Sequence, residues 1–288
     1  MKKAKKNKTG EFIINILRGF LIGATDVIPG VSGSTTALIL RVYQRFISAL
    51  RGLTSNIVPF RPKRWDLRFL VPLFLGIGLA VMSMSGVIPY AIEEHPNATF
   101  SFFFGLIAMS AFTLLPDAKT SKRIFLSLLW GIVGFMAAFL LTGMTAVEAS
   151  HSYLFLFISG FFAITAMLLP GVSGSFVLLM LGQYKFVFES LHMIGQRIWH
   201  LVALGLGVLI GIKTTSTAID FFLRKHKAKT MAFLVGLMTG ALRLPFERVR
   251  NALAQGENIW VSVGFVLAGI GLIIILNKAS NWRKKEVI

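Results

Sequence analysis

Long apolar segments alternate with short polar ones along the whole chain. A spanning helix needs about 20 mostly apolar residues, and several segments approach or exceed this length: residues 67–92, 99–116, 124–147, 200–220, 230–246 and 259–277. No long polar stretch separates them, so the pattern shows no separate soluble domain. We therefore expect an all-α, polytopic membrane protein.

Two further apolar segments carry the same motif. Residues 28–34 read Ile-Pro-Gly-Val-Ser-Gly-Ser and residues 169–175 read Leu-Pro-Gly-Val-Ser-Gly-Ser, a shift of 141 residues that Tyr43 and Tyr184 share. Recurrence of such a motif in so short a chain indicates an internal repeat. We expect a first half over residues 1–148 and a second half over residues 149–288.

Pro and Gly interrupt both motif-bearing segments in the middle, which is typical of re-entrant, broken-helix hairpins. We expect one hairpin at about residues 12–50 and the other at about residues 151–195. If the first hairpin enters from the cytoplasm and returns to it, three spans follow, and the second hairpin enters from the opposite face. The pattern thus predicts two inverted repeats, each with one hairpin and about three transmembrane helices.

The distribution of charge supports this topology. The formal net charge is +18, but Lys and Arg cluster in short loops between apolar segments, which favours membrane orientation over nucleic-acid binding. The stretches predicted to be cytoplasmic hold 23 of the 30 Lys and Arg residues, whereas the predicted outer loops carry acids such as Glu93, Glu94 and Glu257. We therefore expect a multi-pass protein with both termini in the cytoplasm.

The sequence shows no pattern of residues that is typical of a metal or cofactor site. The chain has no cysteine, and no two of its five histidines stand at a metal-ligand spacing. We expect no metal and no cofactor, and the sequence leaves the oligomeric state open.

The repeated motif has the chemistry of an anion site. A helix broken at mid-membrane must face protein or a wet cavity, because lipid cannot satisfy free backbone groups. Gly lets the backbone approach a ligand, and a helix N-terminus favours negative charge. We expect both motifs to bind one phosphate through N–H groups and hydroxyls, with these residues: Gly30, Ser32, Gly33, Ser34, Thr35, Gly171, Ser173, Gly174 and Ser175. The alternative is that small residues only permit close helix packing.

A few charged residues within or beside the apolar segments are functional candidates. Arg18 and Arg243 are candidate phosphate contacts, with a position at the membrane interface as the alternative for each. Lys213 is a third candidate cation and has Asp220 as a candidate partner. Asp26, three residues before the first motif's proline, is a candidate proton carrier, with a helix-end role as its alternative.

Three segments resemble the bacterial polyprenyl-phosphate transporters: residues 23–35, 169–176 and 236–243. The resemblance extends over nearly the whole chain, from Arg18 to about Leu276. It implies return of undecaprenyl phosphate from the outer to the inner leaflet of the bacterial plasma membrane for envelope polymer synthesis. Moving a negative lipid inward opposes an inside-negative potential, so we hypothesise proton coupling through Asp26.

Enzymatic functions and transport of a smaller solute fit the sequence less well than transport of a lipid phosphate. Residues 30–33 and 171–174 match the Gly-x-Ser-Gly of intramembrane serine proteases, but a nucleophilic Ser needs a base and no His lies well inside a predicted span. A lipid phosphatase would need paired acids with His or metal ligands, so we expect no enzyme. The nearer rival is a transporter or channel for a small anion or ion-coupled solute. A lateral opening to lipid would separate the two transport functions.

Overall fold

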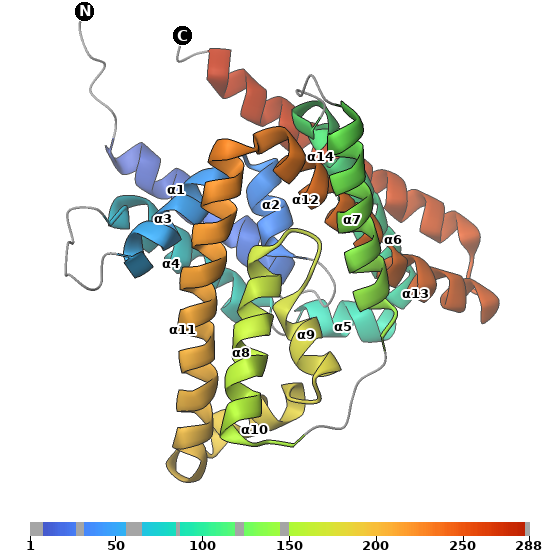
Figure 1. The fold of residues 1–288 in the computed structure, drawn as a ribbon. Coiled ribbons are helices and arrows are strands. Elements are labelled where there is room, and N and C mark those ends of the chain that lie inside the picture. Colours follow the sequence, from blue (N-terminus) through green and yellow to red (C-terminus); the bar gives the residue numbers. More distant parts are fainter. Residues whose placement is uncertain are drawn as a thin grey trace, which may run out of the picture.

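The structure is a computed structural model that describes residues 8–26, 32–55, 65–84, 87–118, 124–144 and 150–285. Within these ranges every regular element is a helix (Figure 1). Among them, five helices are long and apolar enough to cross a membrane. These are α4 (Leu67–Met84), α6 (Pro96–Ala118), α7 (Ile124–Thr142), α11 (Ile194–Lys225) and α14 (Ile259–Lys285). The expected all-α, polytopic membrane protein is confirmed.

Each expected hairpin is a group of three helices. The first group is α1 (Lys8–Asp26), α2 (Gly33–Ile39) and α3 (Tyr43–Ser55), and the second is α8 (Tyr153–Leu168), α9 (Gly174–Met180) and α10 (Tyr184–His192). The second motif separates α8 from α9, and its Gly171 has φ +87, which glycine adopts without steric cost. Residues 28–31 of the first motif lie outside the described residues.

One expected span, at residues 230–246, is divided, so the prediction of a continuous span there is wrong. Residues 67–92 fall in α4 and a short helix, α5 (Val87–Glu94), and residues 85–86 between them lie outside the described residues. Residues 230–246 fall in α12 (Lys227–Ala241) and α13 (Arg243–Ala254). Pro245 lies in the first turn of α13, where a missing N–H is tolerated, whereas a continuous helix would lose a hydrogen bond there.

Glycines bring the helices of each half into backbone contact. Between α1 and α4, a Cβ added to Gly19 or to Gly76 would overlap a carbonyl oxygen of the opposite helix. The same holds for Gly160 and Gly207 between α8 and α11. Small residues at such contacts allow close helix packing in a membrane, so the α1–α4 and α8–α11 pairs are built alike.

The other long helices pack across the two halves. Helix α14 packs on α6, and α7 packs on α12. Gly105 and Gly269 mediate the first contact, and Gly134 and Gly236 mediate the second, again against carbonyl oxygens. The two halves therefore interlock around one core. Their boundary and their inverted orientation stay predictions.

Basic segments gather at one end of the molecule. In Figure 1 the start of α1, the junction of α11 with α12 and the end of α14 all lie towards the top, whereas α9 and α10 lie lower down. The junction and the end of α14 include the basic stretches at residues 224–229 and 278–285.

Candidate functional site

The two motifs are in direct contact although 141 positions separate them in the sequence. The Ser32 hydroxyl donates to the Leu169 carbonyl oxygen at 3.3 Å. In return, the Gly171 N–H donates to Thr35 Oγ1 at 3.0 Å. Helices α2 and α9, which follow the motifs, therefore begin close to each other.

Serine hydroxyls are paired within each motif. Ser32 and Ser34 are 2.6 Å apart at their Oγ atoms, and Ser173 and Ser175 are 2.8 Å apart. Three of these side chains are buried, and that of Ser175 is half-buried. A hydroxyl both donates and accepts, so phosphate oxygens can replace these mutual partners without leaving a donor unsatisfied. Of the predicted phosphate ligands, Gly30 lies outside the described residues.

Asp26 lies beside the first motif. It is the last residue of α1, and its Oδ1 accepts the backbone N–H of Gly33, the first residue of α2, at 2.6 Å. The place that corresponds to Asp26 after a shift of 141 residues is Met167, and its Cβ lies 3.2 Å from a Cβ added to Gly174. Beside the helix that follows each motif, the first half therefore has a carboxyl group where the second half has a thioether.

The predicted arginines have contacts away from the motifs. An Arg18 nitrogen donates to Asn15 Oδ1, one turn earlier in α1, at 3.0 Å. Arg243 donates to the Phe139 carbonyl oxygen at 3.1 Å and to Glu247 at 2.7 Å. Phosphate binding by either arginine stays a prediction.

The buried acid Asp220 is bound by residues other than its candidate partner Lys213. Asp220 in α11 is fully buried and accepts hydrogen bonds from Ser48 and Arg51 of α3, both at 2.5 Å, and from Arg224 at 2.9 Å. The candidate pair with Lys213 is not among these hydrogen bonds, and the Lys213 side chain is exposed. The sequence signal for this cluster was an acid near the end of an apolar span, but its partners on α3 are about 170 residues away.

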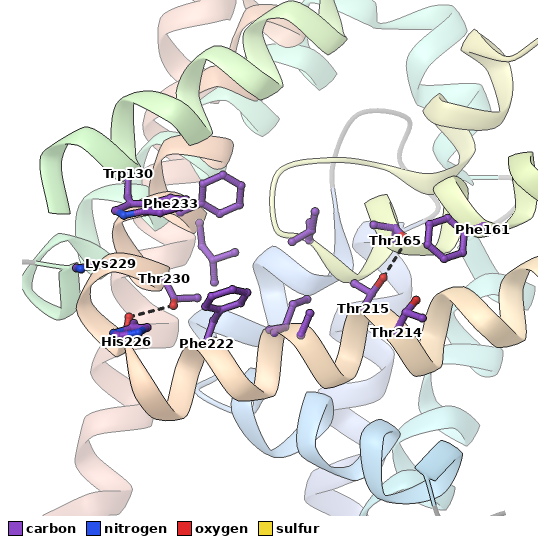
Figure 2. A pocket seen from close by; sticks show the side chains of 14 residues that line it. Trp130, Phe161, Thr165, Thr214, Thr215, Phe222, His226, Lys229, Thr230 and Phe233 are labelled. Atoms are coloured by element: carbon purple, nitrogen blue, oxygen red, sulfur yellow. Dashed lines mark hydrogen bonds between the residues drawn. The ribbon is translucent and has the colours of Figure 1, made fainter. Parts of the chain in front are cut away.

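A lateral groove runs between α7, α8, α11 and α12 (Figure 2). Its volume is about 610 Å³, within the usual range of ligand sites. His226 and Lys229 lie at one end, the Thr165 and Thr215 hydroxyls meet at 2.8 Å towards the other, and aromatic rings lie between. The lining residues are Trp130, Phe161, Thr165, Leu169, Thr214, Thr215, Ala218, Ile219, Phe222, His226, Lys229, Thr230, Phe233 and Leu234.

The groove joins the outer surface of the spanning helices to the paired motifs. Trp130 of α7 and Phe222 of α11 are 44% and 48% exposed, so the groove opens where these helices would face lipid. Leu169 also lines the groove, and its carbonyl oxygen is the one that accepts the Ser32 hydroxyl. An apolar chain in the groove would therefore extend towards the motif serines.

Comparison with known proteins identifies the family. The family model described as undecaprenyl phosphate translocase-like matches residues 22–259. The chain belongs to this family. A polyprenyl-phosphate transporter of Vibrio cholerae is 33% identical over 247 residues, covering 82% of this chain and 78% of the relative. One of Staphylococcus aureus is 35% identical over 279 residues, covering 91% and 94%. No solved structure gives a significant match.

The motif serines of this undecaprenyl phosphate translocase-like protein form hydrogen bonds to other hydroxyls and to a carbonyl oxygen. Ser32 bonds Ser34 and a carbonyl oxygen, and Ser173 bonds Ser175. In the part of the chain that the structure describes, neither serine has a hydrogen bond to a histidine, and His151 instead bonds Gln183 at 3.0 Å.

Proposed function

We propose that the protein carries a polyprenyl phosphate from the outer to the inner leaflet of the bacterial plasma membrane, with both termini in the cytoplasm. The observation that carries this proposal is the groove, which opens towards lipid and reaches the paired motifs at Leu169. Its lining is mostly apolar, as an isoprenoid chain requires. A site for a small hydrated anion would need more polar partners, so the groove favours the lipid.

The phosphate binds at the paired motifs. Ser32, Ser34, Ser173 and Ser175 supply hydroxyl donors, and backbone N–H groups of both motifs add to them. A charged acceptor strengthens each hydrogen bond, typically to roughly 1.5–3 kcal/mol. A groove of this size holds the part of the isoprenoid chain next to the phosphate, while the rest stays in the bilayer.

Lipid binding to the purified protein tests this function. Polyprenyl phosphate should be enriched among the co-purified lipids, and Ala218→Trp, which fills the groove, should abolish that enrichment and the transport in proteoliposomes. Leu206→Trp is the matched control, because Leu206 lies on the same helix, is exposed and does not line the groove. A bound small anion without polyprenyl phosphate would favour the rival transporter instead.

Asp26 couples transport to protons in this proposal. A negative lipid moving inward against the membrane potential costs about 2.3 kcal/mol per charge per 100 mV, and a co-transported proton offsets this cost. Asp26→Asn is a sharp test because an amide oxygen can still accept the Gly33 N–H. It should abolish the response of transport to an imposed pH gradient and leave lipid binding largely intact. If Asp26→Asn responds fully to the gradient, another group carries the proton.

A further inference from the structure

A second groove lies on another side of the α7–α12 pair. One part, about 350 Å³ in volume, is lined by Phe104 of α6, by α7 and α12, and by Arg243 and Arg250 of α13. An adjoining apolar part, also about 350 Å³, is lined by α6, α7 and α12. Phe135 and Thr239 line both parts, so the two are continuous. The result is an apolar groove with two cations at one end.

The two grooves are basic at opposite ends of α12. In the first, His226 and Lys229 lie at the N-terminal end of this helix, and in the second, Arg243 follows its C-terminal end. A helix of 15 residues is roughly 22 Å long. From Thr239, the apolar part of the second groove runs back along α12 to Ala232, towards the end where the cations of the first groove lie.

The α7–α12 pair is a fixed wall between them. A Cβ added to Gly134, Gly236 or Gly240 would overlap a carbonyl oxygen of the opposite helix, so the backbones are in contact along the pair. An occupant of one groove therefore cannot pass between the two helices to reach the other.

A groove that is apolar along its length and cationic at one end matches a lipid with an apolar chain and an anionic headgroup. We propose that the second groove is a separate binding site for the same class of lipid, a single apolar chain with a phosphate headgroup. This proposal rests on the proposed function. Positive charge at the second groove's head supports it, since Arg243 and Arg250 face one acid, Glu247.

Arg250 is the residue to test. Arg243 already bonds Glu247 and the Phe139 carbonyl oxygen, and its guanidinium carbon lies 4.5 Å from the Phe139 ring centroid. Those contacts position α13 against α7, so changing Arg243 would disturb the helix packing as well as any ligand. Arg250 is exposed, and Arg248 on the same helix is exposed but does not line the groove. Arg248→Gln therefore removes one positive charge from α13, as Arg250→Gln does, but it changes no residue that lines the groove.

The experiment is cross-linking with a polyprenyl phosphate that carries a photoreactive group on its first isoprene units, followed by peptide mapping on the full chain in proteoliposomes. In the unaltered protein we expect adducts both in α11 near Ala218, which lines the first groove, and in α7 near Phe135, which lines the second groove close to its cations. Arg250→Gln should lower the α7 adduct about tenfold, as loss of one charge-assisted contact implies, and leave the α11 adduct unchanged. Ser32→Ala with Ser173→Ala, which alters the proposed phosphate site of the first groove, should do the reverse, and Arg248→Gln should change neither.

The outcomes separate this inference from the proposed function. Adducts in α11 alone overturn the second site and leave the transport function standing, whereas no adduct in either groove overturns both. Efficient competition at α7 by an ordinary two-chain phosphatidylglycerol would overturn the proposal as well, because the groove would then be a structural lipid site.

Discussion

The two hairpin groups share a motif but differ in how firmly they are held. Every residue of α2 is buried, whereas α9 has Gly174 as its buried residue. Tyr43 is 2% exposed and donates to the Leu168 carbonyl oxygen at 2.9 Å, while its counterpart Tyr184 is 38% exposed. The copies of the repeat therefore differ in their surroundings, and the environment decides which copy is a fixed part of the core.

The helices that end the two groups are anchored differently to α11. Helix α3 is anchored through the fully buried Asp220, whereas α10 has the half-exposed Glu189, which meets Lys185 at 3.9 Å and Arg197 at 3.6 Å. Buried charges cost much when they lose their partners, and exposed ones cost little. The first group should thus be sensitive to substitution in its stability, and the second group chiefly in its transport.

The largest difference should follow from removing the cations of each anchor. Arg51→Ala with Arg224→Ala leaves Asp220 buried without a counter-charge, which should lower the free energy of unfolding by roughly 3–5 kcal/mol. Lys185→Ala with Arg197→Ala leaves Glu189 partly in solvent and should cost about 1 kcal/mol. Thermal unfolding in detergent measures both. Equal losses would contradict the proposed difference in anchoring.

The two tyrosines should give a smaller difference. Tyr43→Phe removes the donor to a buried carbonyl oxygen, so we expect a loss of about 1–3 kcal/mol in unfolding free energy. Tyr184→Phe alters a side chain in contact with solvent or lipid and should change stability by about 0.5 kcal/mol or less. A Tyr184→Phe protein as unstable as Tyr43→Phe would show that both groups are equally fixed.

Substitution of the two motif serines should affect stability differently but transport equally. Ser32→Ala and Ser173→Ala each remove a hydroxyl from the proposed phosphate site and should both slow transport by about tenfold or more. Ser32 also links the two motifs through the Leu169 carbonyl oxygen, so its loss should lower stability by about 1 kcal/mol. Normal transport by the double variant would remove the hydroxyls from the proposed site.

Single cysteine substitutions, which should disturb the structure least, test the orientation of the two halves in the membrane. Cysteine can replace Glu93 or Lys227, both exposed, in a chain without natural cysteines. We expect an impermeant thiol reagent to reach Glu93→Cys from outside the cell and Lys227→Cys from the inside alone. The opposite result at either position would contradict the inverted arrangement, while transport by both variants should stay normal.

Sequence-based reasoning succeeded where the physical cause is local. An apolar segment long enough to span a bilayer is apolar whatever packs beside it, so the existence of the long helices was predictable from hydropathy. Their ends were less predictable. The expected span at residues 230–246 became two helices, because continuous apolar character does not reveal where a chain turns.

The repeated motif could be found from the sequence, but its contacts could not. The sequence by itself determined that the chain is a helical membrane protein with two copies of one motif, since both conclusions depend on residues close together in the chain. The tertiary structure alone decided that Ser32 meets Leu169, that Asp220 binds Arg51 of α3 rather than Lys213, and that grooves lie on two sides of the α7–α12 pair. Those contacts join residues more than 100 positions apart, and which distant side chains meet is set by how the helices pack, which no local pattern encodes.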